Sequence, residues 1–180
     1  MSRWPGAAVF REGATLETGR LRLRVPEERD LEAFAAIYAD AETMRYIGEG
    51  RTFNRAETWR SIANMLGHWL LRGYGMWTVE RKDTGAAIGR VGYLDSEGWP
   101  GFELGWLLAR PEWGRGYATE AARAALAHAT GALGRERVIS LIRPGNAPSA
   151  RVAAKLGLRR EGEIELLGGP VDVYANRPAP

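Results

Sequence analysis

The stretch RPEWGRGYATEAA, residues 110–122, decides the predicted fold, because a strand end, a glycine-bearing loop and a helix start follow one another in it. The first turn of a helix exposes backbone N–H groups that lack partners, together with the positive end of the helix dipole. Glycines at Gly114 and Gly116 remove the side chains that would keep an anion away from these donors. The stretch therefore predicts a cradle for a diphosphate at the start of the helix.

Other phosphate-binding motifs match this loop poorly. A nucleoside triphosphatase loop requires Lys followed by Ser or Thr after its last glycine, whereas Tyr117 and Ala118 stand here. A dinucleotide fingerprint requires a third glycine or alanine and belongs to an early βαβ unit, whereas this loop lies past the middle of the chain. A tight turn that merely joins strand and helix remains open as another explanation of the two glycines.

Outward from this stretch, apolar periodicity divides the chain into strands and helices. Leu21, Leu23 and Val25 alternate with arginines, as in a half-buried strand. Two helices are expected next, one after Pro26 and one from Asn54 to Gly73. Their predicted apolar faces are Leu31, Phe34, Ala35 and Tyr38, and then Trp59, Ile62, Ala63, Leu66 and Leu70. The remaining elements are strands over 74–81, 86–94 and 102–109, a helix over 117–133, a strand over 137–142, a helix over 147–156, and strands over 158–167 and 171–175.

This order of elements favours the α/β class, with one mixed sheet and helices on both of its faces. The 180 residues suit a single domain spanning 1–180, with its core at about 20–175.

Composition excludes several classes of protein. The chain has no cysteine, which excludes a disulfide scaffold and a thiol nucleophile, and its two histidines lack the neighbours of a metal site. Its 25 basic and 22 acidic residues are scattered, which disfavours nucleic-acid binding; a basic binding domain remains the least favoured alternative, on the pI of about 9.5 alone. Met1–Phe10 lacks the apolar centre of a signal peptide, and no run is long enough to cross a membrane, so we expect a cytoplasmic protein.

Three segments together resemble the GNAT N-acetyltransferase superfamily, in particular its RimJ/RimL-like branch of ribosomal-protein N-terminal acetyltransferases. The segments are ELGWLL at 103–108, WGRGYATEA at 113–121, and NAPS at 146–149 followed by KLGL at 155–158. The resemblance runs from about Arg20 to Ala175. Trp113 stands where the superfamily pattern opens with Gln or Arg, and this agrees with the branch.

The resemblance implies a GNAT fold, whose mostly antiparallel sheet of six to seven strands contains a splayed strand pair that holds the cofactor. It implies acetyl-CoA as co-substrate, with no metal. The coenzyme diphosphate would contact Gly114, Arg115, Gly116, Tyr117, Ala118 and Thr119, and the pantetheine arm would contact Trp106, Leu107 and Leu108. Asn146 would touch the coenzyme through its side-chain amide, and a helix N-cap is its other expected role.

The catalytic residues are predicted on two grounds. Aminolysis needs a neutral amine, and Glu103 is the first candidate base, because it is an acid within an apolar strand; Glu165 is the second. A backbone N–H near Leu108 would meet the oxyanion. Many members of the superfamily have a tyrosine acid where Ala153 stands. The resemblance to the RimL-like enzymes assigns that role to Ser149, but the later glutamate that those enzymes use falls near Gly168.

We expect transfer of an acetyl group to a primary amine, either a protein N-terminal α-amine or a small-molecule amine, by direct attack in a ternary complex. A non-catalytic acyl-CoA-binding module is the alternative. No membrane or nucleic-acid partner is expected, and a homodimer is left open. The residues considered for an acceptor pocket, with core packing as their other role, are Tyr46, Phe53, Trp77 and Tyr93.

Overall fold

The structure is a computed structural model, which describes residues 14–177. The expectation for Met1–Phe10 therefore lies outside the described residues.

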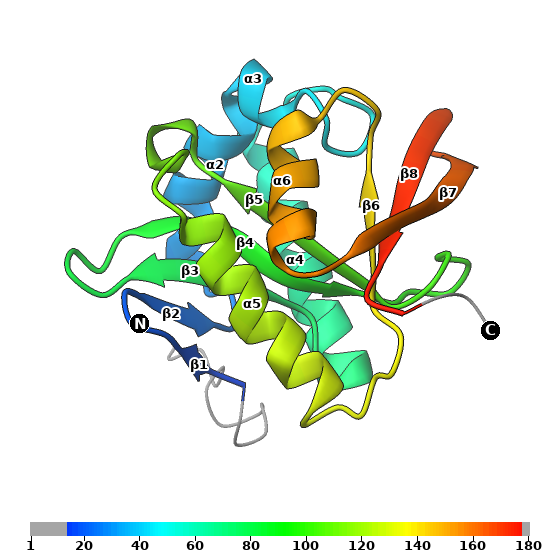
Figure 1. The fold of residues 1–180 in the computed structure, drawn as a ribbon. Coiled ribbons are helices and arrows are strands. Elements are labelled where there is room, and N and C mark those ends of the chain that lie inside the picture. The colour runs from blue at the N-terminus through cyan, green and yellow to red at the C-terminus, as the bar shows by residue number, and fades with distance from the viewer. Residues whose placement is uncertain (1–13, 178–180) are drawn as a thin grey trace.

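Within residues 14–177, eight strands form one sheet in the order β1-β2-β3-β4-β5-β6-β8-β7 (Figure 1). Neighbouring strands are antiparallel except for β5 and β6, which are parallel. The strands are β1 (Leu16–Glu17), β2 (Leu21–Arg24), β3 (Met76–Arg81), β4 (Ala87–Leu94), β5 (Glu103–Leu108), β6 (Ile139–Ile142), β7 (Arg159–Leu166) and β8 (Gly169–Ala175).

Helices cover both faces of the sheet, as predicted (Figure 1). Those of the described residues are η1 (Glu28–Asp30), α2 (Leu31–Ala39), α3 (Ala41–Met44), α4 (Arg55–Arg72), η2 (Arg110–Glu112), α5 (Tyr117–Thr130) and α6 (Ala147–Lys155). Asn54 caps α4 by accepting from the Glu57 amide, and Gly73 ends it in the left-handed conformation.

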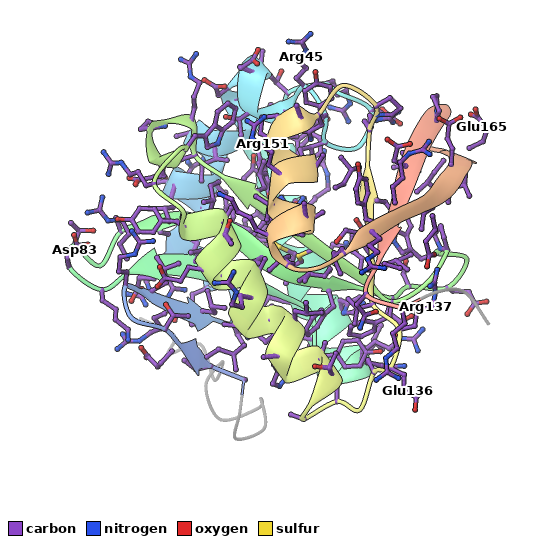
Figure 2. The ribbon with its side chains drawn as sticks, in the orientation of Figure 1. Arg45, Asp83, Glu136, Arg137, Arg151 and Glu165 are labelled. Carbon is purple, nitrogen blue, oxygen red and sulfur yellow. The ribbon has the colours of Figure 1, made fainter. Side chains whose placement is uncertain are left out.

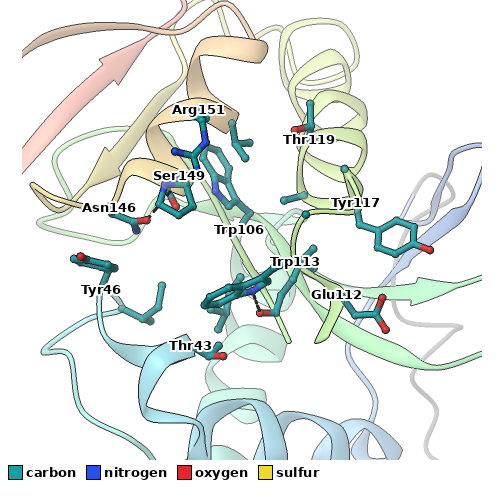
Figure 3. A pocket seen from close by; sticks show the side chains of 18 of the residues that line it. Thr43, Tyr46, Trp106, Glu112, Trp113, Tyr117, Thr119, Asn146, Ser149 and Arg151 are labelled. Atoms are coloured by element: carbon teal, nitrogen blue, oxygen red, sulfur yellow. Dashed lines mark hydrogen bonds between the residues drawn. The ribbon is translucent and has the colours of Figure 1, made fainter. Parts of the chain in front are cut away.

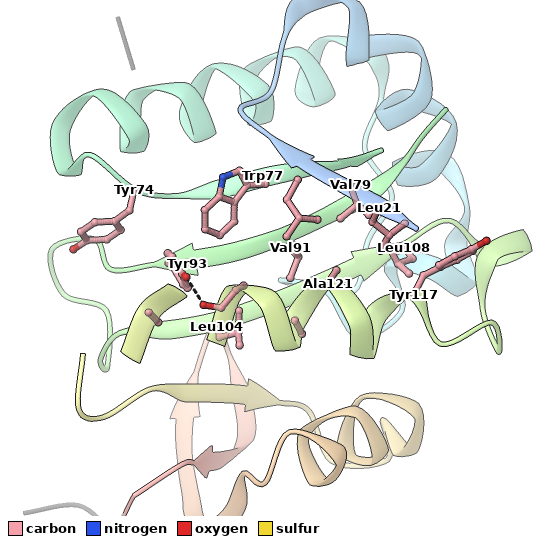
Figure 4. Close-up of a cluster of buried hydrophobic side chains, with 14 of the residues drawn as sticks. Leu21, Tyr74, Trp77, Val79, Val91, Tyr93, Leu104, Leu108, Tyr117 and Ala121 are labelled. Atoms are coloured by element: carbon pink, nitrogen blue, oxygen red, sulfur yellow. Dashed lines mark hydrogen bonds between the residues drawn. The ribbon is translucent and has the colours of Figure 1, made fainter. Parts of the chain in front are cut away.

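Alternation along the strands divides the core between the two faces. On one face, Trp77, Val91 and Leu104 pack against the small side chains of α5, and the Tyr93 hydroxyl donates to the Ala125 carbonyl (Figure 4). Small alanines let this helix lie close to the sheet, which fixes the direction of its N-terminus. On the opposite face, residues of α2, α3 and α4 pack against Met76 and Leu107.

The parallel strands β5 and β6 separate soon after they begin to pair. Glu103 and Ile139 are the one pair of residues in register between them. The Leu104 carbonyl accepts from the Ser140 hydroxyl at 2.7 Å. Beyond this point the two strands diverge, and α6 and the start of α5 lie at the open end (Figure 1). The predicted splayed pair is present.

The structure corrects the prediction in three places. The sheet has eight strands rather than six to seven, because the two-residue β1 is too short to show a period. The short helix α3 was not predicted. The buried face of α4 is Thr58, Ile62, Met65 and Trp69, whereas Trp59 and Leu70 are exposed. The helix carries apolar residues on two sides, so periodicity alone did not single out the buried one.

Candidate active site

The loop between η2 and α5 has the backbone that the sequence predicts. Gly114 and Gly116 have φ values of 75° and 81°, in the left-handed region that favours glycine. Gly116 caps α5 without a side-chain hydrogen bond, and the first intrahelical bond runs from the Glu120 amide to its carbonyl. The amides of Tyr117, Ala118 and Thr119 precede that bond, so they are the free donors of the first turn.

Glu120 fixes the position of this loop against the N-terminal strands. Its carboxylate accepts from the Thr18 hydroxyl at 2.6 Å and from the Arg20 guanidinium at 2.7 Å. Arg20 also donates to the Arg115 carbonyl, and its guanidinium lies 4.3 Å from the centre of the Tyr117 ring. That ring points away from the cavity beside the loop (Figure 3), so Tyr117 offers the cavity its backbone.

A cavity of about 260 Å³, hereafter the loop cavity, lies beside the glycine loop (Figure 3). Its walls include nearly all the residues predicted to contact the coenzyme, namely Trp106, Leu107, Leu108, Gly114, Gly116, Tyr117, Ala118, Thr119 and Asn146. Arg115 does not line it, and the Arg115 side chain pairs with Glu112 at 3.1 Å. A Cβ atom added at Gly114 would have no protein atom within 4 Å, so the loop faces open space.

The edge of β5 supplies further free backbone groups. The Ala109 amide donates to the Ile88 carbonyl, so antiparallel alternation turns the amide and carbonyl of Leu108 and of Trp106 away from β4. They face the gap between β5 and β6. The Trp113 indole donates to the Leu108 carbonyl at 2.8 Å, which leaves the Leu108 N–H available. Trp113 thus ties the glycine loop to the strand.

At the start of α6, the Asn146 side chain accepts from the Ser149 amide at 3.3 Å, which confirms its N-cap role. Its amide nitrogen is left for another partner. Five residues line both the loop cavity and a second cavity: Tyr46, Ile47, Trp106, Asn146 and Ser149. The two cavities therefore adjoin at these residues.

The second cavity, hereafter the acceptor cavity, has a volume of about 480 Å³ and contains Glu103 in its wall. Glu103 is 7% exposed and accepts from the Trp99 indole at 2.7 Å. Burial raises the pKa of Glu103 to about 7, although the Trp99 indole, the Leu141 backbone N–H and the charge of Arg90 act in the opposite direction. A carboxyl group with this pKa exchanges a proton near neutral pH.

The other predicted residues divide between cavity and core. Tyr46 and Phe53 line the acceptor cavity, and Tyr46 donates to the Gly145 carbonyl at 3.2 Å. Trp77 and Tyr93 are fully buried in the core beneath α5, so they do not form acceptor walls.

Glu165 is exposed on β7 and lines neither cavity, and Figure 2 shows it at the edge of the molecule. Ala153 is buried and carries no acid. Gly168 lies in the turn between β7 and β8.

Several residues of the acceptor cavity were not predicted from the sequence, among them Tyr38, Arg90 and Trp99. Tyr38 and Arg90 have no distinctive sequence neighbours, and only the folded sheet brings α2 and β4 together. Trp99 did carry a signal, because it precedes Glu103 by four residues across a turn that contains Gly98 and Pro100.

The described residues contain neither a cluster of metal ligands nor a helix suited to cross a membrane. Within 14–177, no group of three or more His, Cys, Asp or Glu side chains is placed to hold a metal ion. None of the helices in this part of the chain combines the length and apolar character that crossing a membrane requires.

The loop cavity fits a long ligand with a diphosphate near one end, because free helix amides lie beside the loop and an open strand edge leads inward. At the inner end it joins a cavity that contains a buried carboxyl group. Two ligands held in the two cavities would meet at this boundary. This arrangement is the one that the resemblance to acetyl-CoA-dependent transferases predicts.

Comparison with known proteins gives the family. Residues 20–159 match the model of the acetyltransferase (GNAT) domain. The uncharacterized protein YkkB of Bacillus subtilis (strain 168) is 34% identical over 170 residues, which are 90% of this chain and 95% of YkkB. The crystal structure of an acetyltransferase from Agrobacterium tumefaciens C58 has a TM-score of 0.82 at 30% identity, and covers 94% of this chain and 97% of that one. The chain belongs to the GNAT N-acetyltransferases.

The predicted branch is also represented among the structural neighbours. RimJ of Mycobacterium smegmatis, solved with a CoA disulfide, has a TM-score of 0.70 at 23% identity, over 86% of this chain and 80% of that one. At this identity the likeness shows a shared fold. The predicted GNAT fold and family are confirmed.

Proposed function

We propose that the chain, acting as one domain, transfers an acetyl group from acetyl-CoA to a primary amine, by direct attack while both substrates are bound. The observation that carries this proposal is the boundary that the two cavities share, which includes Trp106, Asn146 and Ser149, with Glu103 in the wall of the acceptor cavity. A thioester held from the loop side and an amine held from the other side would meet there without a covalent enzyme intermediate.

Backbone groups would hold the coenzyme. The free amides at the start of α5 would bind the diphosphate, and the exposed edge of Trp106 and Leu108 would pair with the pantetheine amides. When bound, acetyl-CoA supplies a thioester whose carbonyl carbon accepts the amine nitrogen. The Leu108 N–H would stabilise the negative charge that develops on the carbonyl oxygen.

Glu103 would accept the proton that the amine must lose. Its pKa of about 7 leaves the carboxylate mostly ionised above neutral pH and still basic enough to take a proton. As the C–N bond forms and the C–S bond breaks, the Ser149 hydroxyl would donate a hydrogen bond to the departing thiolate, which then takes its proton from solvent. A thiol has a pKa of about 8.5, so the leaving group needs little assistance and a weak acid suffices.

The test combines calorimetry with coenzyme A and release of free thiol from acetyl-CoA in the presence of a panel of peptides, amino acids, polyamines and aminoglycosides. We expect coenzyme binding together with amine-dependent thiol release that Glu103→Gln greatly reduces. Tight coenzyme binding without turnover of any amine would instead support the non-catalytic module. Absence of coenzyme binding would refute the assignment of the loop cavity.

A further inference from the structure

Two residues in the wall of the acceptor cavity carry buried hydrogen-bond donors that have no acceptor among the described residues. Tyr38 is 1% exposed, and its hydroxyl has no partner among the described residues. The Arg90 Nε is likewise buried and unpaired, and one of its terminal nitrogens has only the Met76 sulfur, at 3.5 Å. Both residues line the acceptor cavity. Buried polar groups are usually satisfied, so two such donors on one cavity indicate a missing acceptor group.

The charged side chains in the wall of the acceptor cavity also favour an anionic ligand. The wall contains two arginines, Arg90 and Arg143, and Glu103 is its one acidic residue among the described residues. Within residues 14–177, no carboxylate lies within ion-pair distance of either arginine: Arg143 donates to the carbonyls of Gly48 and Leu167. A cavity of this composition attracts an anion and disfavours a polycation.

The position of Arg90 separates the anion from the reacting amine. In the register of β4 and β5, Leu94 pairs with Glu103, Gly92 with Gly105, and Arg90 with Leu107. Arg90 and Glu103 therefore lie on the same face of the sheet, with the glycine pair between them. A molecule on this glycine floor would reach the carboxyl of Glu103 with one end and the guanidinium of Arg90 with the other.

We propose that the acceptor is a small primary amine that also carries a carboxylate, with the amine directed to Glu103 and the carboxylate bound by Arg90 and the Tyr38 hydroxyl. A carboxylate accepts hydrogen bonds only, which matches two donors, and guanidinium binds it in a planar, charge-assisted geometry. This inference rests on the proposed acetyl transfer and names its substrate class. Polyamines and aminoglycosides are then poor acceptors.

The experiment compares each common amino acid that has a primary amine with its carboxamide and with its decarboxylated amine, measuring kcat/KM by thiol release. The carboxamide has a lower amine pKa and more free amine at neutral pH, so intrinsic reactivity opposes the expected order. We expect at least one acid to exceed its amide about tenfold or more. If no acid is preferred to its amide, the proposed substrate class is wrong. In that case, coenzyme binding together with turnover of other amines would still support the proposed acetyl transfer.

Arg90→Gln tests the residue itself, and Arg159→Gln, a change at an exposed position on β7, is its matched control. Arg90→Gln should bring the acid-to-amide ratio close to one while the calorimetric affinity for coenzyme A stays unchanged; the control should retain the ratio. Should no panel member turn over, calorimetric binding of the acids to the coenzyme-loaded protein decides: binding that Arg90→Gln abolishes supports the proposal, and no binding overturns it. If Arg90→Gln fails to fold, the wild-type panel still decides.

Discussion

Replacing Glu103 by Gln should make the protein less active and, above neutral pH, more stable. The pKa of this carboxyl rises from an ordinary value of 4.5 to about 7 because the group is buried. The folded chain therefore binds the proton more tightly than the unfolded chain. The contribution of Glu103 to folding is most favourable below pH 4.5 and becomes less favourable as pH rises to about 7.

The size of the effect follows from this difference in pKa. Each pKa unit corresponds to 1.36 kcal/mol, so ionising buried Glu103 destabilises the folded state by about 3 kcal/mol at pH 8. Glutamine keeps an oxygen for the Trp99 indole and cannot ionise. The stability of Glu103→Gln relative to wild type should thus be about 2–3 kcal/mol greater at pH 8 than at pH 5.

Urea unfolding followed by tryptophan fluorescence at pH 5 and pH 8 measures this difference, and the titration of all other groups cancels between wild type and variant. Glu165→Gln, at an exposed position, should change stability by less than about 0.5 kcal/mol at either pH. The activity of wild type should rise with a midpoint near pH 7, and Glu103→Gln should lower kcat about 10²-fold or more. An unchanged stability difference would refute the burial argument, and retained activity would refute the role as base.

Three further changes test other parts of the structure. Gly114→Ala and Gly85→Ala place a side chain at φ values of 75° and 69° and should each destabilise the fold by about 1–2 kcal/mol, but calorimetry should show weakened coenzyme A binding only for Gly114→Ala. Ser149→Ala should lower kcat less than about tenfold in the thiol-release assay, because a thiolate leaves readily; a loss of 10³-fold would assign it a larger role. Asp30→Asn breaks a buried pair with arginine and should destabilise by about 3–5 kcal/mol in urea, whereas Glu32→Gln, in an exposed pair, should change stability by less than about 1 kcal/mol.

The glycine loop was predictable because its signal is local. Two glycines before an alanine-rich helix specify a left-handed cap and free first-turn amides without reference to the rest of the chain. Asn146 was predictable for the same reason, as a helix cap. Glu103 was predicted as a candidate base because it is an acid within an apolar strand, but its burial and its pKa depend on the surrounding fold, including Trp99 and the neighbouring strand β6.

The acceptor cavity was not predictable to the same extent, because its residues come from distant segments that only the sheet register brings together. Tyr38 and Arg90 stand on α2 and β4, and no spacing in the sequence relates them. Likewise, nothing local distinguishes Tyr46 and Phe53, which line the cavity, from Trp77 and Tyr93, which fill the core. Aromatic residues suit both environments, so the sequence pattern leaves that choice to tertiary packing.

Two arginines on one face of the sheet show how a structural charge differs from a functional one. Arg24 and Arg90 both pair in register with Thr78, from the strands on either side of it. Arg24 donates two bonds to Asp30 and one to Glu80, so carboxylates match its charge. Burial alone would raise the pKa of Asp30, but the bonds from Arg24 and from the Glu27 backbone N–H lower it.

Arg90 occupies the equivalent place on the other side of Thr78, and no carboxylate in the described part of the chain lies within ion-pair distance of it. The same backbone environment thus accommodates a paired guanidinium on one side of Thr78 and an unpaired one on the other. Since a fold can satisfy such a group by placing an acid opposite it, as Asp30 does for Arg24, the missing acid beside Arg90 is best explained by a substrate that brings its own.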